Sequence, residues 1–335
     1  MDLASLVDDG LEVSIVGSFS RVGIALRRQL FGWEPPPDGA LEGRTVLVTG
    51  PTSGLGRAAT DAIAALGARI VLVGRSEARL AAVRDALVAR HGEDRFPIVV
   101  ADMGSLDSVR DAVRRVEATE ARLDVLIDNA GAIFPERRLG PDGIEATLAV
   151  LVVGPFVLVS GLLPLLRRTP GARVISVTSG GMYSQKLDLD DLQSSGGPFS
   201  GSRAYARAKR AQTALVREWA RRLRGTGMAF SAMHPGWADT PGLAETLPGF
   251  YRAMRPLLRT PAEGADTIVW LAADPAGAAT SGALYLDRRP RPFDRIPATR
   301  LGAADRRRLW DAVVGLSGAA DPAPEDRAGR PAPEG

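Results

Sequence analysis

The sequence predicts an α/β fold with one doubly wound parallel sheet, an N-terminal helical extension and a disordered C-terminal tail. Short β-branched runs, such as residues 44–49 and 69–73, alternate with longer helical segments, which is the pattern of a parallel sheet covered by helices. The first run also leads through a glycine-rich turn directly into a helix. With 335 residues, the chain can form one large domain, which we expect at residues 41–317.

Composition excludes several function classes. Hydrophobic residues make up 45% of the chain and charged residues 24%, as in an ordinary globular protein. The net charge is only +3 and the arginines are scattered, so we expect no nucleic-acid partner. There is no cysteine, and His91 and His234 are the only histidines, so we expect no metal site and no Ser-His-Asp triad. The N-terminus lacks a positively charged signal segment, and we therefore expect a cytoplasmic protein.

Residues 1–40 form the predicted extension and a proline-rich linker. From Phe19 onward, apolar residues recur at helical spacing at Val22, Leu26 and Leu30, with arginines on other faces. Such a basic amphipathic helix can lie on a membrane surface, here through residues 19–33. We favour packing on its own domain or on a partner subunit, because a helical apolar stripe is usually a core face.

The strand at residues 44–49 runs into a glycine turn and then into a helix at residues 57–66. This order is the context of a dinucleotide-binding fingerprint in a Rossmann fold. Glycines let the backbone approach a pyrophosphate, and the helix N-terminus supplies N–H donors to it. We therefore expect a dinucleotide at this turn, where the chain places Gly50, Thr52, Ser53, Gly54, Leu55 and Gly56.

The second strand, residues 69–73, is followed by Arg75. An acidic residue at this point of a Rossmann fold would bind a free ribose 2′-hydroxyl. Arginine instead offers a planar donor fork that suits a 2′-phosphate. This position favours NADP(H) over NAD(H), although a simple surface arginine is the alternative in so arginine-rich a chain.

The alternation continues with helices near residues 77–90 and 106–117 and with strands at 96–101 and 123–127. Ligands bind at the carboxyl ends of such strands, where this chain places Asp102, Met103 and Asn129. Asn129 is the only asparagine in the chain. A single asparagine at the carboxyl end of a strand, where a cofactor would bind, indicates a functional residue.

Residues 146–166 carry no charge and are long enough to span a membrane. Gly154, Pro155, Gly161 and Pro164 interrupt them, and they lie within the soluble α/β pattern. We therefore predict a buried helix, covered by the sheet on one side and by a partner subunit on another.

Tyr205 and Lys209 lie four residues apart in a predicted helix that follows a strand at residues 172–179. Lysine is rare here, since Lys186 is the only other one, and the spacing puts phenol and ammonium on one helix face. A neighbouring cation lowers a tyrosine pKa and prepares it for acid–base work. On these residues alone, a surface tyrosine beside a solvated lysine is an equal alternative.

The rest of the chain completes the pattern. We expect a strand at 228–233, an apolar helical lid at 247–258, a helix at 261–273, a strand at 283–286 and a helix at 301–316. From Ala319 the chain holds only proline, alanine, glycine and charged residues, which predicts a disordered tail at residues 318–335.

Five ordered motifs now indicate a family: the turn from Thr49 to Gly56, Asn129-Ala130-Gly131, Ser179, Tyr205 with Lys209, and Pro235-Gly236 with Thr240. Over roughly residues 42–290 the chain resembles the short-chain dehydrogenases/reductases. The stretches 179–182, 185–187, 191–193, 233–242 and 264–266 narrow the resemblance to one group of oxidoreductases within it. Ser179 and Tyr205 are 26 residues apart, similar to the retinol-dehydrogenase-like members, which carry an insertion there.

The resemblance implies a role for each motif. Tyr205 would be the general acid or base, Ser179 would bind the substrate oxygen, and Lys209 would hold the nicotinamide ribose and lower the Tyr205 pKa. Thr240 would bind the carboxamide. The full expected cofactor site is Gly50, Thr52, Ser53, Gly54, Leu55, Gly56, Arg75, Asp102, Met103, Asn129, Ala130, Gly131, Tyr205, Lys209, Pro235, Gly236, Trp237 and Thr240. Family members form dimers or tetramers through the helices that here hold Leu151 and Tyr205, which implies a homo-oligomer.

Leu151 departs from the family pattern. The family has an asparagine there, which anchors a water that relays protons to the lysine. Leucine can neither donate nor accept a hydrogen bond, and this chain has no other asparagine to replace it.

Two hypotheses follow. The first is an NADP(H)-dependent oxidoreductase acting on a carbonyl or alcohol of an apolar small molecule. The second is an NADP(H)-binding protein with weak or no catalysis, which acts as a sensor, a scaffold or a peripheral membrane protein. A sugar-nucleotide epimerase shares the tyrosine and lysine, but Asn129-Ala130 and Pro235-Gly236 argue against it.

Overall fold

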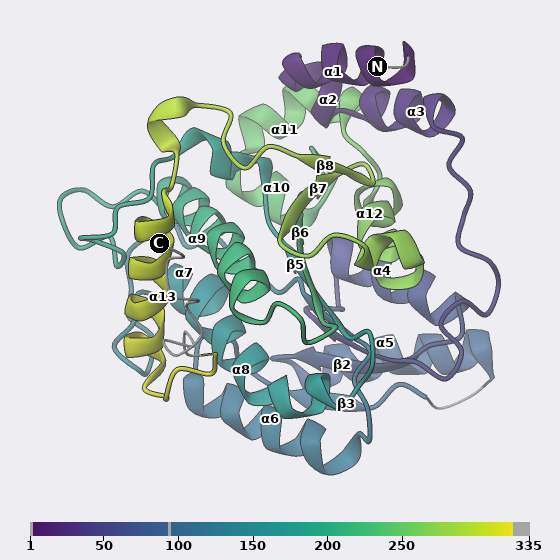
Figure 1. Cartoon of the computed structure of the whole chain (residues 1–335), viewed down its shortest axis with the longest axis vertical. Coiled ribbons are helices and arrows are strands. Elements are labelled where there is room, and N and C mark those ends of the chain that lie inside the picture. Colours follow the sequence, from purple (N-terminus) through teal and green to yellow (C-terminus); the bar gives the residue numbers. More distant parts are fainter. Residues whose placement is uncertain (1–2, 93–94, 324–335) are drawn as a thin grey trace, which may run out of the picture.

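The computed structural model describes residues 3–92 and 95–323 and confirms the predicted sheet (Figure 1). Within these residues, eight strands pair in the order β3-β2-β1-β4-β5-β6-β7-β8, all parallel except the antiparallel pair β7–β8. The strands are β1 Thr45–Thr49, β2 Arg69–Gly74, β3 Ile98–Val100, β4 Val125–Asp128, β5 Arg173–Val177, β6 Ala229–Met233, β7 Ala283–Leu286 and β8 Arg289–Arg291. The apolar runs of β1 and β4 are buried on both faces, as parallel strands between helices must be.

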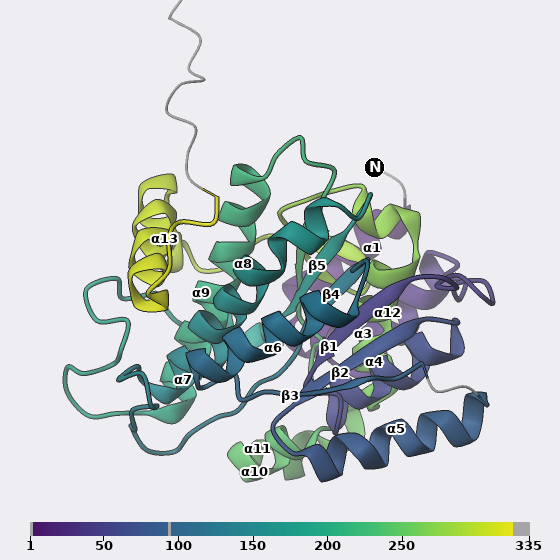
Figure 2. The ribbon, with the colours of Figure 1, turned by 90° about the horizontal axis from the view of Figure 1, so that it is seen from below.

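Helices cover both faces of the sheet (Figure 2). Successive side chains along each strand point to opposite faces of the sheet and so belong to two separate apolar clusters. One cluster packs against α4 Gly54–Ala65, α5 Glu77–His91 and α12 Pro261–Ala273. The other packs against α6 Leu106–Thr119, α8 Gly154–Arg167, α9 Gly201–Arg222 and α13 Ala303–Ser317. The remaining short elements are α7 Ala146–Leu148, α10 Pro241–Thr246, α11 Pro248–Met254, and the segments η1 Ala149–Val153, η2 Gly180–Ser184, η3 Arg255–Leu257, η4 Pro275–Ala278 and η5 Pro297–Thr299.

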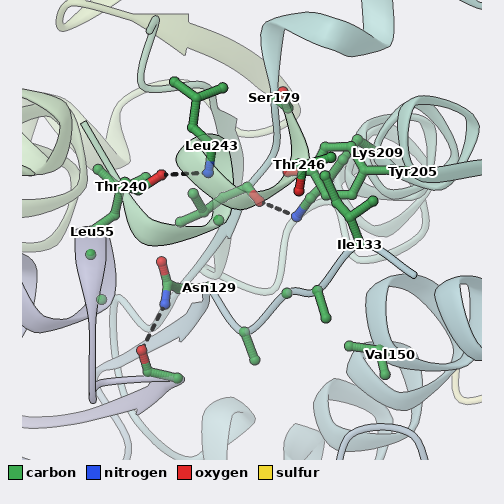
Figure 3. A pocket seen from close by; sticks show the side chains of 18 of the residues that line it. Leu55, Asn129, Ile133, Val150, Ser179, Tyr205, Lys209, Thr240, Leu243 and Thr246 are labelled. Atoms are coloured by element: carbon green, nitrogen blue, oxygen red, sulfur yellow. Dashed lines mark hydrogen bonds between the residues drawn. The ribbon is translucent and has the colours of Figure 1, made fainter. Parts of the chain in front are cut away.

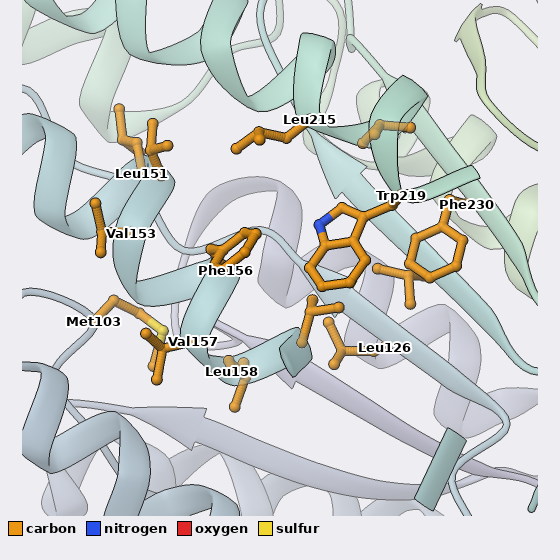
Figure 4. Packing of buried hydrophobic residues seen from close by; sticks show 14 of the residues in the cluster. Met103, Leu126, Leu151, Val153, Phe156, Val157, Leu158, Leu215, Trp219 and Phe230 are labelled. Carbon is orange, nitrogen blue, oxygen red and sulfur yellow. The ribbon is translucent and has the colours of Figure 1, made fainter. Parts of the chain in front are cut away.

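The uncharged segment is a core helix. Ala146–Arg167 is the one stretch in the described chain long and apolar enough to cross a membrane, with a mean hydropathy of 2.4, yet 78% of it is buried in the protein. Phe156 packs against Trp219 of α9 at a ring-centroid distance of 5.1 Å (Figure 4). Trp310 of α13 packs against the same phenyl ring at 5.0 Å. Helix α13 of the same chain thus packs against α8 and α9. The expected contact of these helices with a partner subunit stays a prediction.

The extension packs on its own domain as three short helices, α1 Leu3–Val13, α2 Ile15–Phe19 and α3 Arg21–Leu30. The expected orientation of α3 is wrong, because Val22 and Leu26 are 46% and 39% exposed, whereas Arg27 is fully buried. The Arg27 guanidinium donates to Asp8 and to Asp287, at 2.6 Å each. These buried carboxylates require a buried cation, and that requirement decides which face of α3 turns inward.

The C-terminal residues 318–323 also contact the domain. Trp310 Nε1 donates to Asp321 at 3.1 Å, Arg222 pairs with the same carboxylate, and Ala323 is buried. The rest of the tail that we expect to be disordered, residues 324–335, lies outside the described residues.

Candidate active site

A cleft of about 1310 Å³ opens at the carboxyl ends of the parallel strands (Figure 3). Single small-molecule sites measure about 300–1,000 Å³, so this cleft has room for a larger ligand or for two. Every residue that the sequence places in the site lines it: Gly50, Thr52, Ser53, Gly54, Leu55, Gly56, Arg75, Asp102, Met103, Asn129, Ala130, Gly131, Ser179, Tyr205, Lys209, Pro235, Gly236, Trp237 and Thr240.

The glycine turn forms the floor of one end of the cleft. Gly50 and Gly54 have φ of +69° and +52°, which L side chains rarely adopt. Gly56 has no room for a side chain, since a Cβ there would lie 2.2 Å from Gly50 O and 2.3 Å from Asn129 Nδ2. Helix α4 begins at Gly54, so its free N–H groups face the cleft.

Asn129 ties together the ends of two strands. Its side-chain amide donates to Thr49 O at 2.9 Å and to Gly50 O at 3.2 Å. In return, Thr49 Oγ1 accepts from the backbone N–H groups of Asn129 and Ala130, at 2.9 Å each. The single asparagine therefore holds the glycine turn in shape, a structural role that its position alone did not reveal.

Two guanidinium groups line the cleft next to the end of β2. Arg75 follows β2 and is exposed, and Arg79 from the first turn of α5 lines the same cleft. Ser76 caps that helix by accepting from Arg79 N at 3.4 Å. Sequence reasoning missed Arg79, although its place one helical turn after Arg75 was visible.

Ser179 and Tyr205 both line the cleft, and the Ser179 side chain lies within reach of the Tyr205 phenol. Ser179 follows β5 and caps η2 by accepting from Gly181 N at 3.2 Å. Tyr205 and Lys209 share one face of α9, as predicted, and Lys209 Nζ lies 5.8 Å from the Tyr205 ring centroid. Lys209 Nζ donates to Val177 O at 2.7 Å and to Gln212 Oε1 at 3.2 Å.

Burial dominates the acid–base properties of this pair. Although the cleft leaves Tyr205 partly accessible, burial raises its pKa to about 12, against a smaller opposing effect of the hydrogen bond with Ser179. Burial lowers the pKa of Lys209 to about 8, and the charge of Asp128 opposes that shift. The Lys209 ammonium binds Val177 O and not the phenol, and burial decides the direction of the Tyr205 pKa shift. That Lys209 lowers the Tyr205 pKa stays a prediction.

Leu151 is fully buried within the π-helix η1. A Cβ on Gly131 would lie 3.2 Å from Leu151 Cδ2 and 4.0 Å from Lys209 Nζ, so leucine and ammonium approach the same point. Leu151 offers no polar atom to the lysine. Two residues that sequence reasoning missed, Asp128 and Gln212, form the polar surroundings of Lys209 on its inner side. Asp128 could have been found from the sequence, because a carboxylate at the end of a buried apolar strand needs a specific partner.

The N-terminal extension also reaches the site. Trp237 N donates to Phe19 O at 2.8 Å, and a Cβ on Gly180 would lie 2.4 Å from Phe19 Cε2. Arg259 donates to Ser18 O at 2.8 Å and to Pro235 O at 3.1 Å. Residues 18–19 therefore support both the loop after Ser179 and the loop at Pro235-Gly236, a role not foreseen from the sequence.

His234 takes no part in acid–base chemistry. It is fully buried against the rings of Phe19 and Tyr183, at centroid distances of 4.8 and 5.8 Å. Burial lowers its pKa to about 3, so the imidazole stays neutral.

Comparison with known proteins assigns the family. The family model described as short chain dehydrogenase matches residues 44–248. The chain belongs to the short-chain dehydrogenase/reductase family. It is 40% identical over 251 residues to human dehydrogenase/reductase SDR family member 12, covering 75% of this chain and 78% of that protein. This relative is of the group that the sequence stretches indicated.

Two further relatives extend the comparison. DnrU of Streptomyces sp. (strain C5), a "Putative daunorubicin C-13 ketoreductase", is 41% identical over 84% of this chain and 95% of its own. The Pseudomonas aeruginosa RhlG/NADP active-site complex superposes with a TM-score of 0.61 at 26% identity, over 74% of this chain and 96% of that one. These relatives confirm the doubly wound fold and the assignment as an oxidoreductase.

Proposed function

We propose that the protein transfers a hydride between the nicotinamide of NADP(H) and a carbonyl or alcohol carbon of an apolar small molecule. The observation that carries this proposal is that the Ser179 side chain lies within reach of the Tyr205 phenol in a cleft that begins at the glycine turn. A general acid and a second hydrogen-bond donor at one point are what carbonyl reduction requires of the protein.

The cleft fits the cofactor by shape and by donor set. Gly56 leaves the close approach that a pyrophosphate needs, and the N-terminus of α4 supplies N–H donors. Bound in the cleft, NADP(H) would supply the hydride. The chain's own residues do the rest: Tyr205 gives a proton to the carbonyl oxygen, Ser179 orients that oxygen, and Lys209 and Thr240 hold the nicotinamide half.

Arg75 and Arg79 support NADP(H) over NAD(H). Both line the cleft beyond β2, where the adenosine ribose lies in this fold, and the pair presents two donor forks to a 2′-phosphate. The RhlG complex contains NADP. Replacing both arginines with alanine is expected to weaken NADPH binding at least tenfold while leaving NADH binding unchanged, because only NADPH carries the phosphate.

An apolar substrate is supported by the lid. Leu243 of α10, Phe250 of α11 and Leu247 between the two helices line the cleft. Phe250 packs edge-on against Trp237, with ring centroids 5.2 Å apart. No residue of α10 or α11 is buried, so these helices can move without breaking a core. The ketoreductase name of DnrU supports a carbonyl as the reacting group.

The test is an NADPH fluorescence titration followed by turnover measurements over a panel of apolar aldehydes and ketones, with Tyr205→Phe as the control. We expect tight binding in both proteins and turnover in the native one alone. Binding without Tyr205-dependent turnover over the whole panel would refute the enzyme proposal.

Leu151 favours a second candidate, a binding protein with weak catalysis. Leu151→Asn separates the two, because asparagine restores the polar group of the family at η1. An increase in turnover would show an impaired enzyme. Unchanged, absent turnover would favour the binding protein.

A further inference from the structure

Asp128 and Lys209 form a buried charged pair joined by one side chain. Asp128 ends β4 on the face that turns toward α9 and is 2% exposed. Gln212, one turn after Lys209, donates from Nε2 to Asp128 Oδ2 and accepts from Lys209 Nζ at 3.2 Å through Oε1. Only this orientation of the amide satisfies both neighbours, since a carboxylate accepts and an ammonium donates.

Lys209 needs a countercharge because it is buried. Moving an ammonium out of water favours its neutral form, and the other acceptor at Lys209, Val177 O, is uncharged. The phenol of Tyr205 is neutral, and on the η1 side Leu151 brings only an apolar side chain. Among the described residues, Asp128 is the charged group that acts on Lys209.

The carboxylate of Asp128 is held in place by several neighbours. Its strand partner on β5 is Ser176, whose hydroxyl favours the ionised form. Gln212 and Lys209 favour it too, while burial opposes it. Gln212 holds Oδ2 by a hydrogen bond, whereas the buried Oδ1 has no hydrogen-bond partner among the described residues, so the charge of Lys209 is what compensates this carboxylate.

We propose that Asp128, acting through Gln212, is the positioning residue that keeps Lys209 protonated and fixed, in place of the polar group that Leu151 lacks. The consequence for catalysis rests on the proposed function. The coupling of the two charges does not.

The coupling defines a pH window. Burial raises the pKa of Asp128 to about 6 and lowers that of Lys209 to about 8. Between these values both groups are charged. Above the upper value Lys209 loses its proton, and below the lower value Asp128 gains one, so each limit breaks the pair.

The chain allows a direct measurement, because Lys186 and Lys209 are its only lysines. In the full-length protein labelled with ¹³C at lysine Cε, NMR gives two side-chain signals, and Lys186→Arg identifies the exposed one. The titration midpoint of Lys209 should lie near 8 in the native protein. In Asp128→Asn it should fall by roughly one pH unit or more, the size expected for loss of a neighbouring opposite charge.

Two further variants keep the test decisive. Gln212→Leu keeps a similar volume but removes the bridge between Asp128 and Lys209, so the Lys209 midpoint should fall. Asp124→Asn is the matched control, because this carboxylate is also buried beside β4 but binds Arg44 and Arg122, not Lys209. It should leave the midpoint unchanged.

The proposal is overturned if a folded Asp128→Asn protein keeps the native Lys209 midpoint, or if a folded Gln212→Leu protein keeps it. The NMR readout needs neither cofactor nor substrate. Failure to find a carbonyl substrate would therefore refute the proposed function and leave this result standing, and the reverse also holds.

Discussion

Arg27→Met tests whether the extension is held by buried charge. Arg27 is fully buried and contacts Asp8, Glu12 and Asp287. Methionine keeps much of the aliphatic length and removes the cation. Breaking a buried pair by removing one partner costs about 3–5 kcal/mol. Asp287 keeps Arg259 at 2.6 Å and Asp8 keeps Arg291 at 2.9 Å, so we expect a loss near the lower limit, about 3 kcal/mol.

The assay is urea unfolding of the full chain, followed by fluorescence and by an NADPH titration. Arg28→Met is the matched control, because Arg28 is next to Arg27 in the same helix but is exposed. Its substitution should change the free energy of unfolding by no more than about 0.5 kcal/mol. Loss of the extension should also weaken NADPH binding, since Phe19 supports Trp237. Equal stability of the two variants would refute the reasoning.

Four other outcomes follow from the structure. Gly56→Ala should reduce NADPH affinity at least tenfold because its Cβ would strike Gly50 O, whereas Gly242→Ala, in open space beside the same cleft, should not; titration of both variants checks this. Carbonyl reduction should decline as pH rises above about 8, where Lys209 loses its proton; a flat profile would contradict the role of its charge. Trp310→Ala should lower the free energy of unfolding by about 3–5 kcal/mol, measured in urea, because the ring is fully buried. Burial alone would raise the pKa of Asp8, but Arg291 and Arg27 lower it below 3.8. The ionised Asp8 carboxylate should therefore contribute its full stabilisation above that pH. Acid unfolding should show this contribution being lost as the pH falls further.

The sequence predicted the parts of the site that depend on local order. A strand, a glycine turn and a helix in succession bring the turn to the carboxyl end of the strand, where a dinucleotide binds in this fold, so Gly50, Gly54 and Gly56 were correctly placed. Parallel strands then bring their carboxyl ends to one edge, which placed Asp102 and Asn129 beside the turn without further information.

What escaped prediction depends on partners far away in the chain. Arg27 turns inward because Asp287, 260 residues later in the chain, requires a cation. The spacing of apolar residues within α3 could not predict this contact. Likewise, the bridge from Lys209 to Asp128 joins α9 to β4, and a pattern within either element does not show the contact. The covering of Phe156 by Trp310 depends in the same way on a helix near the end of the chain.

The long contact between Arg27 and Asp287 also affects how the protein is made. During synthesis at about 5–20 residues per second, the 260 residues between them take roughly 13–52 seconds to appear. Until then α1–α3 have no place to dock, and Arg27, Asp8 and the helix apolar residues stay in water. Because Phe19 supports the loop at Trp237, residues made long before this loop are among the last to reach their final place. The nascent chain therefore depends on keeping α1–α3 soluble until its last strands emerge.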